Sequence, residues 1–257
     1  MSDASKPEIS RRRFIGGGAA AAAGLAIAPG VFLTEVSRAR PADQPASAEN
    51  RWGMLIDTTK CAEGCDACVH GCQQENGWGG PNSNEKHSSA LQKSQWIRIV
   101  NVRDKETGFA ATLPMMCQHC EHPPCVDVCP TGASMKRADG IVLVDRHICI
   151  GCRYCMMACP YKARSFVHED LRDQLPTAPR GKGCVESCTL CVHRVDRDGP
   201  DAVPACAEAC AAEGHDAFIF GDLNDPNSRI SEALAKHGGT KIRDDLGLNQ
   251  GVRYRGI

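Results

Sequence analysis

Seventeen cysteines are the residues of this chain with the clearest chemistry, and sixteen of them fall into four groups of four. In each group the fourth thiol follows the third after three intervening residues. The groups are Cys61, Cys65, Cys68 and Cys72; Cys117, Cys120, Cys125 and Cys129; Cys149, Cys152, Cys155 and Cys159; and Cys188, Cys191, Cys206 and Cys210. Closely spaced thiols of this kind bind the iron atoms of iron-sulfur clusters. Four groups of four predict four 4Fe-4S clusters.

Two cysteine-proline pairs predict how the middle groups share their clusters. Pro130 follows Cys129 and Pro160 follows Cys159, as in the bacterial two-cluster ferredoxin run, whose fourth thiol binds the other cluster. The predicted ligand sets are Cys117, Cys120, Cys125 with Cys159, and Cys149, Cys152, Cys155 with Cys129. This crossing of ligands ties the two halves of the unit together.

The same crossing pairs the first and last groups across the whole chain. The predicted ligand sets are Cys61, Cys65, Cys68 with Cys210, and Cys188, Cys191, Cys206 with Cys72. We therefore expect an α+β fold of two nested bacterial-ferredoxin-like modules, each with two clusters, joined by short β-hairpins, helices and long loops. The outer module is assigned to residues 50–95 plus 184–225, the hairpin and inner module to residues 96–169, and a C-terminal extension to residues 226–257.

Short apolar runs supply the elements that hold these groups. Met54–Ile56 and Ala217–Phe220 are expected to pair as the small sheet of the outer module. The remaining predictions are a hairpin of Trp96–Val100 with Phe109–Leu113, a strand over Ile141–Val144 after the Asp139-Gly140 turn, a helix over Ser228–His237, and loops over Gly77–Ser89 and Asp170–Gly183.

The N-terminus has the pattern of an export signal. Ser10-Arg11-Arg12-Arg13-Phe14-Ile15 precedes a weakly apolar run, Gly16–Leu33, which is the layout of a twin-arginine signal peptide. The signal is assigned to residues 1–39, with cleavage after Ala39 or as late as Ala48. Because the run is only weakly hydrophobic, a permanent membrane anchor is the lesser alternative. Because the twin-arginine route exports folded proteins, the signal predicts a periplasmic protein that is exported with its clusters already bound.

Other uses of so many thiols are less consistent with the spacing. Zinc ribbons use paired Cys-x2-Cys knuckles rather than groups of three with a fourth thiol. A disulfide scaffold is usually small, and neighbouring thiols at this density are poorly placed to bridge one another. Cys184 stands outside the four groups, and it is either a spare thiol near a cluster or a replacement for Cys188.

Several polar residues lie beside the predicted ligands without being needed as ligands. The histidines are His70, His119, His122 and His193, which we interpret as packing or surface residues, some of them able to tune a cluster by hydrogen bonding. Arg153, Lys162 and Arg164 lie near the third group, where they either stabilise a reduced cluster or solvate a face.

Composition excludes several classes of function. A net charge of −1 gives no basic excess for nucleic acid, and the sequence has no serine-histidine-acid set, phosphate-binding glycine loop or open metal site. Only 5% of residues are aromatic, so bound metal is expected to contribute to stability. We therefore expect a chain that is not an enzyme in its own right.

The chain resembles a known family, the four-cluster iron-sulfur subunits of the dimethyl sulfoxide, polysulfide and tetrathionate reductases. The resemblance covers roughly residues 52–257. It is carried by Cys117-Gln118-His119-Cys120, by Pro123-Pro124-Cys125, by the run from Cys149 to Tyr161, and by Phe220-Gly221-Asp222-Leu223-Asn224-Asp225-Pro226. The resemblance implies an electron-transfer subunit that relays single electrons through its clusters.

Within this family, the chain is most similar to the DsrO branch, the periplasmic subunits of the Dsr membrane complex of sulfur-metabolising prokaryotes. Its own export signal, Lys162–Val167 and Gly251–Tyr254 carry this finer resemblance. It implies membrane association through partners: a polysulfide-reductase-type integral membrane subunit that handles quinone, a periplasmic multihaem cytochrome c, and other Dsr complex subunits. The alternative is the iron-sulfur subunit of a molybdopterin reductase for tetrathionate or polysulfide. A third possibility is an exported metal-scaffold protein with no redox role.

Overall fold

The computed structural model describes residues 45–79, 92–171 and 175–257. Its elements in chain order are β1 (Trp52–Asp57), η1 (Thr58–Lys60), α2 (Ala67–Asn76), β2 (Ile97–Arg103), β3 (Ala110–Met116), α3 (Pro124–Asp127), β4 (Ser134–Lys136), β5 (Val142–Val144), α4 (Tyr154–Ala158), β6 (Arg164–Phe166), β7 (Val185–Ser187), α5 (Val192–Asp198), η3 (Gly199–Asp201), α6 (Ala205–Ala212), β8 (Phe218–Asp222), α7 (Arg229–His237), η4 (Asp244–Leu246) and β9 (Val252–Arg255). Short helices and small sheets make this an α+β fold, as predicted. The predicted export signal lies outside the described residues.

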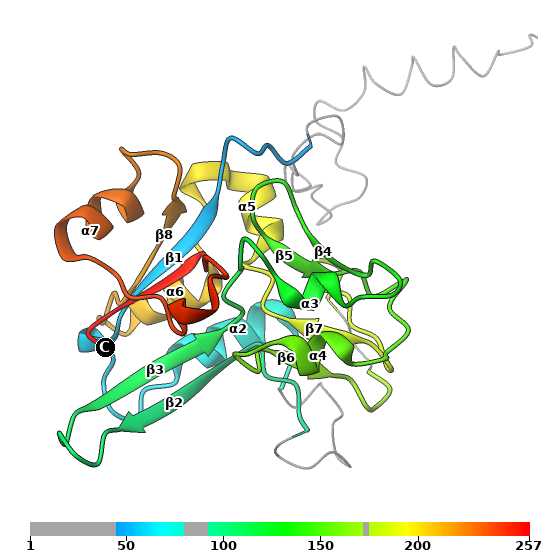
Figure 1. Cartoon of the computed structure of the whole chain (residues 1–257), viewed down its shortest axis with the longest axis horizontal. Helices are drawn as coiled ribbons and strands as arrows, with labels where there is room; N and C mark the ends of the chain where they lie inside the picture. The colour runs from blue at the N-terminus through cyan, green and yellow to red at the C-terminus, as the bar shows by residue number, and fades with distance from the viewer. Residues whose placement is uncertain (1–44, 80–91, 172–174) are drawn as a thin grey trace, which may run out of the picture. The chain divides into compact units, whose positions relative to one another are not determined.

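The central strand of the largest sheet is β1, which joins distant parts of the chain (Figure 1). It pairs antiparallel with β8, with Leu55 opposite Ile219, and parallel with β9, with Leu55 opposite Arg253. Every residue of β1 is buried. The predicted pairing of Met54–Ile56 with Ala217–Phe220 is confirmed. The sequence does not single out β9 as a strand, because four residues that alternate apolar and charged side chains carry a weak signal.

The predicted hairpin is present as β2 and β3; α2 packs against β2, and the turn end of the hairpin projects to the lower left in Figure 1. Val100 lies opposite Leu113 in its register. The turn is stabilised by Asp104, whose carboxylate accepts hydrogen bonds from the backbone N–H groups of Glu106 and Thr107. This pattern is an Asx-type turn.

Two smaller ladders lie in the middle of the chain. β4 pairs with β5, with Ser134 opposite Val144, across the predicted Asp139-Gly140 turn. β6 pairs with β7, with Arg164 opposite Ser187. β7 falls in the range assigned to the outer module and β6 in the range assigned to the inner module, so a β-ladder joins the two ranges directly.

The predicted C-terminal helix is confirmed as α7. The hydroxyl of Ser228 caps it by accepting a hydrogen bond from the Ser231 N–H, and Gly238 follows its last residue. Of the predicted loops, Gly77–Ser89 lies mostly outside the described residues, and Asp170–Gly183 is described except for residues 172–174.

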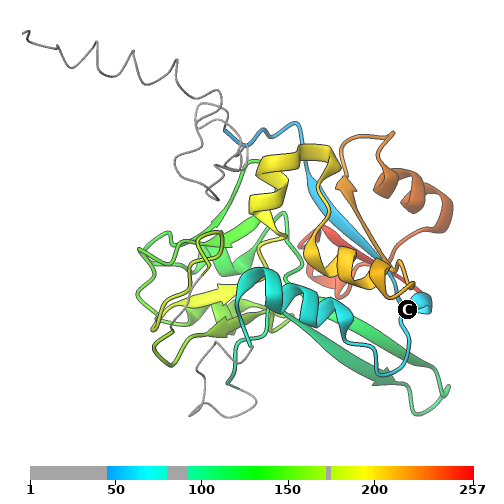
Figure 2. The same ribbon diagram turned by 180° about the vertical axis from the view of Figure 1, so that it is seen from behind.

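Helices α2 and α6 pack against each other at a glycine (Figure 2). A Cβ on Gly71 would lie 2.6 Å from the Cβ of Ala209 and 2.8 Å from the carbonyl oxygen of Ala205. The two helices carry Cys68, Cys72, Cys206 and Cys210. A glycine therefore sets how closely the first and last cysteine groups approach.

The core combines thiols with the few large side chains of the protein. All three tryptophans, Trp52, Trp78 and Trp96, are buried in the same apolar cluster as most of the grouped cysteines. No helix in the described parts of the chain is both long and apolar enough to cross a membrane.

Candidate iron-sulfur sites

All seventeen cysteines lie in the described residues, and each is a free thiol. Within residues 45–79, 92–171 and 175–257, no group of three or more His, Cys, Asp or Glu side chains is placed to hold a single metal ion. The grouped thiols instead surround spaces between elements. Such spaces fit a multi-atom cluster with one thiolate on each iron.

Two cavities are each lined by one complete predicted ligand set. The first is lined by Cys72, Cys188, Cys191 and Cys206, together with Trp96 and Met116 among its apolar walls. The second is lined by Cys129, Cys149, Cys152 and Cys155. In both cases the thiol that comes from another cysteine group faces the same cavity as the other three.

A third set of thiols meets at the end of β1. Burial, followed by the nearby thiolates of Cys210 and Cys65, raises the pKa of the Cys61 thiol to about 11. Burial and nearby thiolates, that of Cys210 first, raise the pKa of Cys68 to about 12. Because charge interactions of this kind act over short distances, Cys210 lies beside thiols that precede it by more than a hundred residues.

The fourth set combines one middle group with Cys159. Burial, then the thiolates of Cys125 and Cys159, raise the pKa of Cys120 to about 12. Burial also raises the pKa of Cys117, with Cys125 and Cys159 among its charged neighbours. Such thiols are protonated in the metal-free chain at neutral pH, so cluster assembly must release their protons.

The cysteine spacing explains how one helix serves two clusters. The third and fourth thiols of a group lie four residues apart, which places them one turn apart on the same face of a helix. On α2, Cys68 meets Cys61 and Cys210, whereas Cys72 lines the cavity of Cys188. α6 likewise carries two thiols, and its Cys206 lines the cavity of Cys188 whereas its Cys210 lies near Cys61.

The connections between ligands bend through left-handed backbone. Gly151 has φ +70°, and a Cβ there would lie 2.2 Å from the carbonyl oxygen of Gly183. Arg153 and Cys191 also adopt positive φ, at the residues that precede α4 and α5. The chain thereby turns sharply enough to wrap several thiols around one space.

Two side chains donate hydrogen bonds to the sulfur of Cys72. The indole Nε1 of Trp78 lies 3.2 Å from this sulfur, and the amide of Asn76 lies 3.5 Å from it. N–H donors stabilise a thiolate and the added charge of a reduced cluster. The sequence analysis missed both residues, and their only signal was their position just after a predicted ligand.

Backbone amides make similar contacts at other ligands. The N–H groups of Ser134, Leu190, Ala205 and Ala217 donate to Cys129, Cys188, Cys191 and Cys210, respectively, at 3.3 to 3.4 Å. These donors belong to the fold itself, so they hold the sulfur atoms in place without a charged side chain.

The histidines near the ligands have separate environments. His119 is buried, and its Nδ1 accepts a hydrogen bond from the backbone N–H of Val142 at 3.1 Å. Burial lowers the pKa of His119 to about 3, so its imidazole is neutral. His70 and His122 are exposed. In the described residues, no histidine nitrogen hydrogen-bonds a cysteine sulfur.

The three cations after the third group differ in position. Arg153 and Lys162 are exposed, and the Arg153 guanidinium stacks 3.9 Å from the ring centre of Phe166. Arg164 is buried, and its Nη2 donates to the sulfur of Cys125 at 3.1 Å. Of these three side chains, that of Arg164 donates a hydrogen bond to a predicted ligand sulfur, whereas Arg153 lines the second cavity.

Cys184 is buried beside the second cavity. Its thiol donates a hydrogen bond to the carbonyl oxygen of Arg146 at 3.2 Å. Burial and the neighbouring Cys149 raise the pKa of Cys184, which favours the protonated thiol. Cys188, the ligand it was considered to replace, lines the first cavity.

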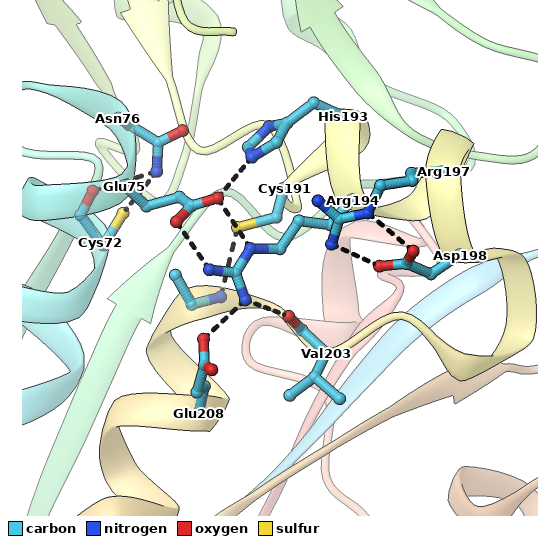
Figure 3. Close-up of polar contacts among 11 residues, drawn as sticks. Cys72, Glu75, Asn76, Cys191, His193, Arg194, Arg197, Asp198, Val203 and Glu208 are labelled. Carbon is cyan, nitrogen blue, oxygen red and sulfur yellow. Dashed lines mark hydrogen bonds and ion pairs between the residues drawn. The ribbon is translucent and has the colours of Figure 1, made fainter. Parts of the chain in front are cut away.

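A charged network joins the helices that carry the outer thiols (Figure 3). Arg194 of α5 binds the carboxylate of Glu75 on α2 with two hydrogen bonds of 2.7 and 2.6 Å. His193 lies 2.6 Å from the same carboxylate. Arg194 also donates to Glu208 on α6 and to the carbonyl oxygen of Val203. The network therefore links α2, α5 and α6, which all lie beside the first cavity.

We expect Glu75→Gln to destabilise the protein by about 1–2 kcal/mol, after allowance for solvent screening of these partly exposed groups. Hydrogen bonding from Arg194 lowers the pKa of Glu75 to about 2 from its usual 4.5. A lowered carboxyl pKa stabilises the fold above about pH 4.5, and this contribution is lost as the pH falls toward 2. Thermal unfolding of the anaerobic holoproteins at pH 7 should show the full difference in stability between the wild type and Glu75→Gln. This difference should become smaller below pH 4.5.

The matched control for this prediction is Glu208→Gln, because Glu208 binds the same arginine from a more exposed position. Its effect should be smaller than that of Glu75→Gln. Equal effects of the two variants would contradict the assignment of Glu75 as the main partner of Arg194.

Comparisons with known proteins agree with this arrangement of thiols. A 4Fe-4S dicluster domain matches residues 109–221, and another 4Fe-4S dicluster domain matches residues 60–133. Together the two matches cover all four cysteine groups. The sixteen grouped thiols thus fit four 4Fe-4S clusters.

Named relatives cover most of the chain. The Hdr-like menaquinol oxidoreductase iron-sulfur subunit 1 of Archaeoglobus fulgidus is 38% identical over 96% of this chain and 97% of its own length. A tetrathionate reductase subunit of Salmonella typhimurium is 36% identical over 84% of this chain and 77% of its own length. The iron-sulfur cluster-binding subunit of the menaquinone reductase of Nitratidesulfovibrio vulgaris is 34% identical over 79% of this chain and 88% of its own length. The chain therefore belongs to the family of 4Fe-4S iron-sulfur subunits that transfer electrons within oxidoreductase complexes.

Proposed function

We propose that this protein relays single electrons through four 4Fe-4S clusters held by the crossed ligand sets described above. The observation that carries the proposal is the first cavity, where Cys72 faces Cys188, Cys191 and Cys206 from a part of the chain more than a hundred residues away. Its counterpart is the electrostatic influence of Cys210 on Cys61 and Cys68, which indicates that these thiols lie near one another. Both support two nested ferredoxin-like modules with the ends of the chain closing over its middle.

The bound clusters would supply one-electron chemistry, and the chain supplies their surroundings. Apolar walls such as Met54, Trp96 and Met116 exclude water from the first site. Amide and indole N–H groups stabilise negative charge on the sulfur atoms. The thiol of Cys152 is exposed, so the site that it lines with Cys129 lies near the surface, where a redox partner can approach.

Analysis of iron and acid-labile sulfide in the anaerobically purified protein tests this proposal. We expect about sixteen irons and about sixteen sulfides per chain, and four paramagnetic centres on reduction. A content well below sixteen irons would refute the four-cluster assignment. Iron that gives no reducible paramagnetic signal would favour a metal scaffold without a redox role.

We further propose that the protein serves a Dsr-type membrane complex. In this role it passes electrons between a quinone-handling membrane subunit and a periplasmic multihaem cytochrome c, and it binds the membrane through these partners. Two features support the proposal: the resemblance of Lys162–Val167 and Gly251–Tyr254 to that branch, and similarity to a menaquinol oxidoreductase subunit over 96% of the chain.

The second candidate is the iron-sulfur subunit of a molybdopterin reductase, which similarity to a subunit of tetrathionate reductase favours. Copurification from the native membrane distinguishes the two complexes. A multihaem cytochrome and a heterodisulfide-reductase-like protein in the complex would support the first, and a large molybdopterin subunit would support the second.

Periplasmic export through the twin-arginine route is also part of the proposal. Replacing Arg11 and Arg12 together with lysine should retain the cluster-loaded protein in the cytoplasm, because the route depends on the arginine pair. Cell fractionation followed by immunoblotting measures this, with the unaltered signal as control. An unchanged periplasmic amount would show that these arginines are not the export signal.

A further inference from the structure

One buried cation lies among thiols of both inner ligand sets. Arg164 begins β6 and is only 6% exposed. Its Nη2 donates a hydrogen bond to the sulfur of Cys125 at 3.1 Å, and Cys155 is among the charged neighbours of the same side chain. Cys125 belongs to the set completed by Cys159, whereas Cys155 belongs to the set completed by Cys129. The guanidinium therefore lies close to thiols of both sets.

Among the residues that the structure describes, no carboxylate balances the charge of Arg164. In the described residues no ion pair joins Arg164 to an acidic side chain, and its buried Nη1 has no hydrogen-bond partner. A buried charge without a counter-ion is strongly unfavourable. When they bind iron as thiolates, Cys117, Cys125 and Cys155 are the anionic groups that stabilise this charge.

The outer sites show a different arrangement. Arg194 lies near Cys191, but it binds the carboxylates of Glu75 and Glu208, which neutralise its charge. Cys72 is a predicted ligand of the outer module, and the N–H donors to its sulfur come from the neutral side chains of Trp78 and Asn76. Among the described residues, only the inner pair of sites is thus bridged by an arginine without an acidic partner.

We propose that Arg164 sets the reduction potentials of the two inner clusters together. Reduction adds one electron, and so one negative charge, to a cluster and forms or breaks no bond to the protein. A fixed positive charge close to ligands of both clusters stabilises the reduced form of each. Arg164 is thus a positioning residue for charge, and its removal lowers both potentials in the same direction. The inference depends on the proposed ligand assignment.

Redox titration of the anaerobic holoprotein, followed by electron paramagnetic resonance, tests the inference. Arg164→Gln should lower the midpoint potentials of the two inner clusters and leave those of the outer two unchanged, with the iron content intact. Arg164→Lys keeps the charge but not the forked donors, so it should give a smaller shift in the same direction. Arg98→Gln is the control, because in the described residues the Arg98 guanidinium hydrogen-bonds the carbonyl oxygens of Tyr161 and Lys162 and no cysteine sulfur.

Each other outcome decides against the inference. Unchanged potentials in Arg164→Gln, or a shift of a single cluster, would overturn it. If Arg164→Gln loses iron, Arg164→Met takes its place as an uncharged variant of similar length, and unshifted inner potentials in that variant would overturn the inference. A wild-type protein with fewer than four clusters refutes the proposed function, whereas four clusters without the shift refute only the role of Arg164.

Discussion

Cys210→Ser should remove the cluster held by Cys61, Cys65 and Cys68 while the inner two clusters persist. Cys210 is expected to close that site from α6, and serine is a poor replacement for a thiolate on iron. The loss is also expected to loosen the contact between the ends of the chain, because metal binding contributes folding free energy. Iron content should fall to about twelve per chain or lower, with the inner paramagnetic signals retained.

Two other cysteine variants serve as controls for this experiment. Cys184→Ser should keep all four clusters, because Cys184 bonds a backbone carbonyl and lies outside the four ligand sets. Cys129→Ser should instead remove an inner cluster, the one held by Cys149, Cys152 and Cys155, and should leave the two outer clusters in place. The nested assignment is wrong if Cys210→Ser removes an inner cluster instead.

Gly71→Ala should destabilise the protein by about 1–3 kcal/mol and reduce its content of the two outer clusters. Helix propensity alone predicts the opposite sign, because alanine is more favourable than glycine inside a helix by about 0.5–1 kcal/mol. The steric clash outweighs helix propensity, because the new Cβ would lie 2.6 Å from the Cβ of Ala209 and 2.8 Å from the carbonyl oxygen of Ala205. The separation of α2 from α6 would move Cys72 away from Cys206.

Thermal unfolding and iron analysis of the same anaerobic samples measure this effect. His70→Ala is the matched control, because His70 precedes Gly71 on α2 and its side chain is 63% exposed. That variant should be close to neutral in stability and in iron content. A stabilised Gly71→Ala protein with all four clusters would show that the two helices tolerate a wider spacing.

The parts of the fold that the sequence could predict are those specified by residues that lie close together in the chain. Cys129-Pro130 and Cys159-Pro160 predict the crossing of ligands, and two of the four predicted sets each line one cavity. The hairpin and α7 carried turn and capping residues that specify their ends. These features depend on residues close together in the sequence, so a single sequence contains the information.

Other features depend on contacts that only the folded chain creates. The pairing of β6 with β7 involves two strands of three residues each, too short for a periodic pattern. Trp78 has the sequence context of a loop, yet its indole reaches the sulfur of Cys72. Arg153 and Arg164 were equivalent in the sequence, and only burial separates the exposed cation from the one that contacts ligands.

The position of β1 has a consequence for how the protein folds during synthesis. This strand leaves the ribosome about 160 residues before β8 and about 200 residues before β9, its two neighbours in the sheet. Until both arrive, its buried edges have no partners, while the middle of the chain can already form its own short-range ladders. We therefore expect the inner half to fold early and the outer half to close last, which makes an unfinished chain vulnerable to aggregation through β1.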